Sequence, residues 1–375
     1  MSAVLLPILP PLIAALAVLI LRRGSAALAL AGATLSLAGG VRLLAGALDG
    51  QAETLLLPGL PDMPLRLVSG PMTALLSVAV ATVGTFVLVY AIGYMKRESG
   101  QARFYAVMSL FLAAMQALVL AGDWVLLLAA WELIGLCSYL LIGFWFQRPE
   151  AANAASRAFL YTRSADLGLY VAIFILIGSS GTSEIAASLE VGGSASTAAG
   201  LLLLLAAMGK SAQVPLQDWL MRAMAERDLK RLLAASTASQ YGLMLIAVGA
   251  GVPTAALLHL LAHAAIKSTL FLAAGDFQHA REGTAFDQLK GVGRARPWAF
   301  AGFALAALAL AGIPPLSGFF SKDAVIAAAL SGQGAAWLGP LALAGTLLTG
   351  AYMGRALRVL WQGSGDSRPV EGTGW

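Results

Sequence analysis

The chain has 375 residues, of which 59% are hydrophobic and only 11% are charged, and its formal net charge is +5. Soluble domains carry about 25% charged residues, so this composition excludes a water-soluble enzyme. One cysteine and three histidines also exclude a disulfide scaffold, an iron–sulfur centre and a multi-cysteine zinc site.

Apolar runs recur along the whole chain, and each is long enough to cross a bilayer as a helix. They predict an all-α integral membrane protein, a polytopic bundle of about eleven transmembrane helices of which two are broken. We expect one transmembrane domain over residues 1–361 and a disordered tail over 362–375. In chain order the predicted spans are 3–21, 26–48, 71–95, 104–121, 123–145, 158–178, 199–220, 229–250, 254–277, 298–330 and 336–361.

The positions of the positive charges indicate the topology. Nineteen of the 24 Lys and Arg residues lie on the side of the connections that follow odd-numbered spans, and only Arg42 and Arg66 lie on the opposite side. Connections rich in Lys and Arg face the cytoplasm. We therefore expect an N-terminus outside and a C-terminus in the cytoplasm of a bacterial-type inner membrane. The net charge follows from this topology and does not indicate a nucleic-acid partner.

The three remaining basic residues, Lys210, Lys267 and Lys322, lie inside predicted spans. Lysine in an apolar environment can release its proton, whereas arginine stays charged in proteins. A charged residue at membrane depth is costly and needs a partner or a function. Proton exchange is therefore the favoured role, and a side chain that extends to the membrane interface is the alternative.

Glu132 lies within the predicted span 123–145, where an unpaired carboxylate would be very costly. We expect it to be protonated or paired, with Lys210 as the favoured partner. The alternative is a static structural ion pair. Arg163 and Asp166 lie at the start of the next span and are either ordinary interfacial charges or part of the same site.

Prolines predict breaks beside two of the lysines. Pro215 follows Lys210, and Pro314 and Pro315 precede the neighbouring pair of Lys322 and Asp323. Proline removes a helix hydrogen bond, and irregular backbone at membrane depth survives only where protein or water surrounds it. Interrupted helices of this kind mark ion sites in transporters.

His259, His263 and Lys267 are four residues apart, so they share one face of a helix. Two histidines at this spacing can ligate a metal, but no third ligand is nearby, and we predict no metal site. The favoured interpretation is a line of proton-exchanging groups that ends on a lysine, and the alternative is a polar stripe without function. Together, the ionisable residues predict a membrane pathway for protons, or for a cation exchanged with protons.

Several motifs resemble a known family. Residues 131–145 read WELIGLCSYLLIGFW and resemble the fifth-helix signature of the largest antiporter-like subunit of respiratory complex I, the subunit L type. The blocks 209–213, 228–231, 259–272 and 318–323 are similar to later motifs of that subunit, in the same order. The wider family includes large subunits of Mrp-type cation/proton antiporters, membrane-bound hydrogenases and bicarbonate-accumulating complexes.

The resemblance implies roles for the ionisable residues. Glu132 and Lys210 would be a charged pair whose separation drives proton movement. Lys267, reached through the two histidines, would be the central relay group, and Lys322 the terminal one on a broken helix. Further residues implied near the cytoplasmic end of the pathway, or in coupling, are Arg163, Asp166 and Asp323.

The resemblance also implies a function and partners. The chain would be a proton-translocating membrane subunit of NADH:quinone oxidoreductase, without a redox cofactor or redox active site of its own. Other subunits of a complex I-like assembly would carry FMN and iron–sulfur clusters and bind quinone. Two alternatives remain open. One is the large subunit of a Mrp-type antiporter or of a related hydrogenase or bicarbonate-uptake complex, and the other is a truncated scaffold that conducts nothing.

The sequence departs from the family between Leu220 and Asp228. Only seven residues stand here, where the family has two further helices. The later helices of the family and its long lateral helix are also missing from the C-terminal region. Removal of two helices preserves the parity of the topology, which agrees with the charge distribution. We expect either a naturally reduced member of the family or an incomplete sequence.

Overall fold

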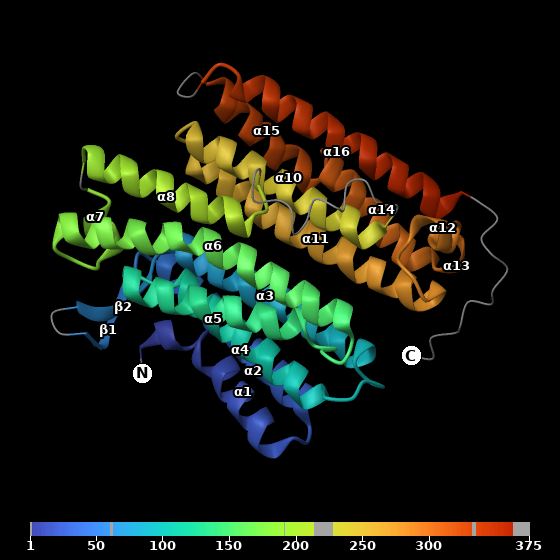
Figure 1. Cartoon of the computed structure of the whole chain (residues 1–375), viewed down its shortest axis with the longest axis horizontal. Helices are drawn as coiled ribbons and strands as arrows, with labels where there is room; N and C mark the ends of the chain where they lie inside the picture. Colours follow the sequence, from blue (N-terminus) through green and yellow to red (C-terminus); the bar gives the residue numbers. More distant parts are fainter. Residues whose placement is uncertain (1, 61–62, 191, 214–227, 332–334, 363–375) are drawn as a thin grey trace. The chain divides into compact units, whose positions relative to one another are not determined.

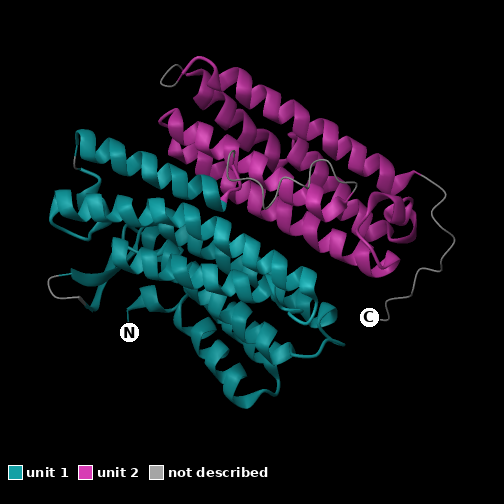
Figure 2. Ribbon diagram, in the orientation of Figure 1, with its two compact units in different colours: residues 1–210 teal, residues 211–375 magenta. Residues whose placement is uncertain are grey.

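The computed structural model describes residues 2–60, 63–190, 192–213, 228–331 and 335–362 (Figure 1). The chain forms two compact units, Met1–Lys210 and Ser211–Trp375 (Figure 2). The single transmembrane domain expected from the sequence stays a prediction, because the structure divides into these two units. The prolyl residue at the first expected break, Pro215, and the expected disordered tail beyond residue 362 lie outside the described residues.

The first unit contains most of the long apolar helices. Its helices are α1 (Leu9–Leu21), α2 (Ser25–Leu48), α3 (Pro71–Tyr94), α4 (Gln101–Val119), α5 (Trp124–Ile142), α6 (Pro149–Ser180), α7 (Ile185–Ser188) and α8 (Ser194–Lys210), preceded by a single turn at Ala3–Leu5. The second unit contains α10 (Leu229–Gly249), α11 (Pro253–Arg281), α12 (Phe286–Leu289), α13 (Val292–Ala295), α14 (Pro297–Ala311), α15 (Ser317–Leu330) and α16 (Leu338–Trp361).

By length and composition, seven of the described helices can cross a membrane, and α1, α8 and α14 are shorter apolar helices. The seven are α2, α3, α4, α5, α6, α10 and α11. The expected polytopic helical membrane protein is therefore confirmed. A described helix lies at the place of every predicted span, with α14 and α15 together occupying the tenth.

Small residues set how closely α1 and α2 pack. A β-carbon added at Gly39 would lie 2.6 Å from the carbonyl carbon of Leu6, and one at Gly32 would lie 3.0 Å from the carbonyl oxygen of Pro10. Between them, Ser36 donates a hydrogen bond to the carbonyl oxygen of Pro7 at 2.6 Å. Glycine and serine at a helix interface allow close backbone approach in membranes. The start of the chain is therefore packed against α2.

A β-hairpin is an element that the sequence analysis did not predict. β1 (Glu53–Leu60) pairs antiparallel with β2 (Met63–Ser69) in the polar connection between α2 and α3. Asp123 anchors β2 to the start of α5. Its carboxylate accepts hydrogen bonds from the backbone N–H of Leu126, as the N-cap of α5, and from that of Arg66 on β2 at 2.5 Å. Arg66 also forms an ion pair with Glu184 at 2.6 Å.

Replacing Asp123 by alanine is expected to destabilise the protein by about 2 kcal/mol. The change removes a helix N-cap and leaves the backbone N–H of Arg66 without its acceptor, and each loss costs about 1 kcal/mol. Thermal unfolding in detergent measures the effect. Asp49→Ala is the matched control, because Asp49 is exposed at the end of α2 and should change stability by less than about 0.5 kcal/mol. Equal stability of the two variants would contradict an anchoring role for Asp123.

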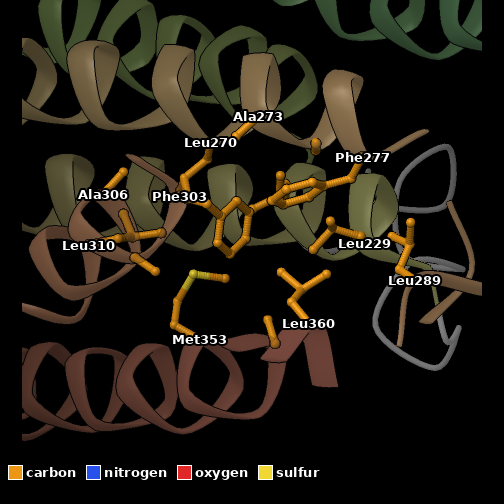
Figure 3. Close-up of a cluster of buried hydrophobic side chains, with 14 of the residues drawn as sticks. Leu229, Leu270, Ala273, Phe277, Leu289, Phe303, Ala306, Leu310, Met353 and Leu360 are labelled. Atoms are coloured by element: carbon orange, nitrogen blue, oxygen red, sulfur yellow. The ribbon is translucent and has the colours of Figure 1, made fainter. Parts of the chain in front are cut away.

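A cluster of buried apolar side chains holds the second unit together (Figure 3). Phe277 of α11 and Phe303 of α14 pack at its centre with ring centroids 5.8 Å apart. Leu229 of α10 and Met353 of α16 complete the contacts among four helices. This packing places α11 among α10, α14 and α15, so one face of α11 is enclosed along its length.

The helix that was predicted as span 298–330 is interrupted in the structure. α14 ends at Ala311, Gly312 adopts a left-handed conformation with φ of 86°, and α15 begins at Ser317. Glycine takes this conformation without steric cost, which makes it suited to the end of a helix. Pro314 and Pro315 occupy the interruption. The interruption directly precedes Lys322 on α15.

Candidate functional site

The first unit contains a cluster of four charged side chains from three helices. Arg163 of α6 forms an ion pair with Glu132 of α5 and lies 3.6 Å from Asp166, one turn further along α6. Lys210, at the end of α8, lies 3.7 Å from the same Asp166 carboxylate. Asp166 is completely buried and also accepts a hydrogen bond from the indole of Trp131 at 2.8 Å. The cluster contains two acids and two bases, so its formal charge is zero.

The pairing differs from the sequence-based expectation. Glu132 pairs directly with Arg163, and Lys210 faces Asp166 rather than Glu132. Arg163 reaches Glu132 because α6 packs against α5. Gly135, one turn after Glu132 on α5, provides space for this contact. A β-carbon there would collide with the guanidinium of Arg163 and lie 3.6 Å from Nζ of Lys210. The missing side chain therefore leaves space for the guanidinium of Arg163 beside α5, a role of Gly135 that was not predicted from the sequence.

The four charges do not form a saturated hydrogen-bond network. Among the described residues, Oε1 of Glu132 and Oδ2 of Asp166 are buried without a hydrogen-bond donor. Lys210 instead lies 5.0 Å from the ring centroid of Trp131, and Arg163 lies 5.0 Å from that of Phe159. The burial of Asp166 excludes an ordinary interfacial charge at this position. Carboxylates with spare acceptor positions can exchange one cation for another, which suits a site whose pairing changes.

The second unit encloses the two histidines and both of its predicted relay lysines. His259, His263 and Lys267 lie along the enclosed face of α11, and Lys322 lies on α15; all four are buried. Nζ of Lys267 donates a hydrogen bond to the carbonyl oxygen of Leu233 on α10 at 2.7 Å. The rings of His259 and His263 are 6.2 Å apart. The spacing seen in the sequence therefore places these groups in one enclosed line.

Lys322 differs from Lys267 in its surroundings. In the described part of the chain, no polar atom forms a hydrogen bond with its Nζ. The aliphatic part of the Lys322 side chain lies beside the helix interruption. A β-carbon added at Gly312 would lie 3.4 Å from Cδ of Lys322. Asp323, which was grouped with the possible coupling residues, lies exposed on α15. The interruption thus lies beside a buried lysine whose Nζ has no hydrogen-bond partner among the described residues.

The sequence analysis missed several uncharged partners of the histidines. His259 contacts Ser321 of α15 at 3.0 Å through Nδ1, and Gln240 of α10 at 3.2 Å through Nε2. Tyr241 packs edge-on against His263 with ring centroids 5.8 Å apart. Gln240 was detectable as an amide inside an apolar span, a costly residue to bury without partners. Within the described ranges, no three His, Cys, Asp or Glu side chains gather as a metal site.

Comparison with known families places both clusters within one sequence family. The family described as NADH:quinone oxidoreductase/Mrp antiporter, transmembrane, matches residues 121–227 and 221–349. The first match includes the four-charge cluster, and the second includes the histidines, Lys267 and Lys322. The family described as NADH-ubiquinone oxidoreductase (complex I), chain 5 N-terminus, matches residues 61–105. These matches confirm the resemblance drawn from the motifs.

Individual relatives agree with this assignment. NADH-quinone oxidoreductase subunit L of Mycobacterium tuberculosis strain H37Rv is 38% identical over 350 residues, covering 76% of this chain and 55% of that protein. Chloroplastic NAD(P)H-quinone oxidoreductase subunit 5 of Ipomoea purpurea is 35% identical, covering 68% of this chain and 47% of that protein. The chain thus spans about half the length of these curated relatives.

Two solved structures share the fold. One is the Mrp complex from Dietzia sp. DQ12-45-1b, with a TM-score of 0.86 and 28% identity over 95% of this chain and 47% of that chain. The other is the membrane-bound sulfane sulfur reductase, an archaeal respiratory membrane complex, with a TM-score of 0.87 over 100% of this chain and 91% of that chain. At 18% identity, the second likeness concerns the fold alone.

Proposed function

We propose, on the premise that this chain belongs to the NADH:quinone oxidoreductase/Mrp antiporter transmembrane family, that it is a proton-translocating membrane subunit of a complex I-like assembly. Its partners are other membrane subunits, while FMN, iron–sulfur clusters and quinone belong to other parts of the assembly. In this proposal the Lys- and Arg-rich connections face the cytoplasm of a bacterial-type inner membrane, which their distribution supports. The chain itself contributes buried groups that accept and release protons.

The observation that carries this proposal is the buried line of proton-exchanging groups in the second unit. His259, His263 and Lys267 share one enclosed face, and Lys322 joins them from the interrupted helix. Ser321, which precedes Lys322 on α15, contacts His259 at 3.0 Å, so the interrupted helix adjoins this line of groups. Like charges repel strongly where water is excluded. A proton that arrives on one lysine therefore disfavours a proton on the other. Mutual repulsion of this kind moves protons along a line without any redox chemistry in the chain.

The four-charge cluster of the first unit supplies a second set of groups whose pairing can change. Glu132 holds Arg163, and Asp166 is shared by Arg163 and Lys210. Movement of Arg163 from Glu132 towards Asp166 would leave Lys210 with less compensation for its charge. Lys210, unlike Arg163, can then release a proton. We assign Arg163 to pairing and Lys210 to proton exchange.

The proposal predicts that Lys267→Met abolishes the proton translocation carried by this subunit. Methionine keeps the length and apolar stem of lysine but cannot carry a proton. The test uses the parent complex purified from its source membrane and reconstituted into liposomes, with protons moved per electron as the measurement. Lys290→Met is the matched control, because Lys290 is half exposed beside α12 and pairs with Asp287. An unchanged ratio in Lys267→Met would contradict the proposal and favour a non-conducting scaffold.

A cation/proton antiporter subunit is the second candidate. The structural likeness to the Mrp complex, at 28% identity over 95% of this chain, supports it. The two candidates differ in their driving reaction. Proton movement that requires sodium or potassium, and that continues without an electron donor, would favour the antiporter. Proton movement that stops when electron transfer stops would favour the complex I-like subunit.

A further inference from the structure

A network of hydrogen-bonded side chains in the second unit leads to His259, and the proposed relay does not use it. It consists of side chains from α10, α15 and α16. Gln240 on α10 connects His259 to Thr349 on α16, and Ser321 on α15 contacts the other nitrogen of His259. Gln240, Ser321, Thr349 and His259 are all buried, with at most 1% of each side chain exposed. Each polar hydrogen of these four side chains must therefore be donated to an acceptor within the protein.

The direction of the hydrogen bonds follows from Thr349. Its hydroxyl carries one proton, which it donates to the carbonyl oxygen of Gly345 at 2.7 Å. The amide nitrogen of Gln240 and the hydroxyl of Tyr352 both lie further away, at 3.2 Å. With its proton given to Gly345, Oγ1 of Thr349 accepts from both groups. Tyr352 has then used its own proton, so its oxygen accepts from Ser236 at 2.7 Å.

The orientation of the Gln240 amide follows in turn. Its nitrogen faces Thr349, so its oxygen faces Nε2 of His259 at 3.2 Å. An amide oxygen only accepts hydrogen bonds, and the neutral imidazole carries a proton on one nitrogen only. A hydrogen bond between these atoms requires that proton on Nε2. The remaining nitrogen, Nδ1, then has a free lone pair directed at Ser321.

We propose that Gln240, held by Thr349, is a positioning residue that keeps neutral His259 in its Nε2–H tautomer. Ser321 has one hydroxyl proton and two acceptors, Nδ1 of His259 at 3.0 Å and the carbonyl oxygen of Gly318 at 3.3 Å. In the Nε2–H tautomer, Ser321 donates to His259. In the opposite tautomer, His259 would donate to Ser321, and Ser321 would donate to Gly318. Gln240 decides between these two arrangements.

The tautomer has a consequence that rests on the proposed function. Neutral His259 can take up a proton only at the nitrogen that lacks one, which is Nδ1. Uptake therefore occurs on the side of Ser321 and the interrupted helix that carries Lys322. The Nε2 proton stays in its hydrogen bond to Gln240, because an amide oxygen accepts a hydrogen bond but does not take up the proton. The proton that arrives at Nδ1 therefore also leaves from Nδ1. Gln240 thus confines proton exchange by His259 to Nδ1, on the side of Ser321.

The test measures the tautomer directly. The full chain is labelled with ¹⁵N in histidine, placed in lipid nanodiscs and examined by NMR, where protonated and unprotonated ring nitrogens give separate signals. The chain has three histidines, and loss of a signal pair in His259→Gln assigns the one of interest. We expect the wild-type chain to show a protonated Nε2 and an unprotonated Nδ1. A protonated Nδ1 in the neutral wild-type ring would overturn the proposal.

Variants test whether Thr349 and Gln240 hold the tautomer. Thr349→Val removes the acceptor of the Gln240 amide while it keeps the side-chain shape, and the single Nε2–H pattern should be lost. Thr349→Ser restores the acceptor and should restore the pattern. Thr346→Val is the matched control, because Thr346 lies on the same helix and its hydroxyl donates to the backbone of that helix, at Ala342, with no side-chain partner among the described residues. An unchanged pattern in Thr349→Val would overturn the role of Thr349.

Gln240→Leu provides an independent variant, in which Nε2 loses its acceptor and the proton should move to Nδ1. Size-exclusion chromatography identifies any variant that does not fold. The same variants in the parent complex show whether protons moved per electron decrease. A changed tautomer with unchanged translocation would support the positioning role but contradict a need for this tautomer in proton translocation, and the proposed function itself is tested by Lys267→Met. An unchanged tautomer in Gln240→Leu, whatever the translocation, would overturn the positioning role.

Discussion

Replacing Arg163 by methionine is expected to destabilise the protein by about 3 kcal/mol, because it removes one partner from a buried ion-pair cluster. Glu132 loses its direct partner. The completely buried Asp166 keeps Lys210, at 3.7 Å, and the hydrogen bond from Trp131. The cluster changes from zero formal charge to −1. Denaturant-induced unfolding in detergent measures the loss of stability. Part of Glu132 remains accessible, which keeps the cost at the lower end of the range for buried pairs.

The control for this prediction is Arg157→Met, which lies on the same helix but is exposed. It should change stability by less than about 0.5 kcal/mol. A double-mutant cycle with Glu132→Gln isolates the pair, and we expect a coupling energy of about 1 kcal/mol or more. Additive effects of the two substitutions would show that Arg163 and Glu132 are not directly paired. Strong coupling of Glu132 to Lys210 instead would restore the pairing expected from the sequence.

Replacing Gly318 by alanine is expected to destabilise the second unit by about 3 kcal/mol and to disrupt the site around His259. A β-carbon at Gly318 would overlap the backbone carbonyl of Ala309, where α14 and α15 approach each other beside the interruption. Backbone cannot yield as a flexible side chain can, so α15 must shift. The shift would carry Ser321 away from His259, whose contact is now 3.0 Å.

Gly350→Ala is the matched control for Gly318→Ala. An added β-carbon at Gly350 meets no atom within 4 Å, and alanine is favoured over glycine inside a helix by about 0.5–1 kcal/mol. Gly350→Ala should therefore be neutral or stabilising. Thermal unfolding in detergent compares the two variants, and protons moved per electron in the parent complex report on the site. A Gly318→Ala protein with wild-type stability would contradict the close approach of the two helices.

Local chemistry explains which features were predictable from the sequence. Helix positions follow from apolar length, and the interruption before Lys322 follows from a glycine and two prolines within five residues. The line formed by His259, His263 and Lys267 follows from their four-residue spacing, because that spacing is a property of any α-helix. The β-hairpin was missed, because its two short, leucine-rich strands lie between much stronger helix signals.

The pairings depended on tertiary structure, because the sequence offers both Arg163 and Lys210 as partners for Glu132 and Asp166 and does not select between them. The choice of Arg163 by Glu132 depends on how α5 and α6 pack and on the space beside Gly135. The contact of Gln240 with Thr349 joins residues 109 positions apart, and that of His259 with Ser321 joins residues 62 positions apart. The sequence alone therefore determined a membrane helical bundle and indicated the ionisable residues that we propose exchange protons. Only the packing of helices determined their partners, because hydrogen bonds and ion pairs select by distance in space and not by spacing along the chain.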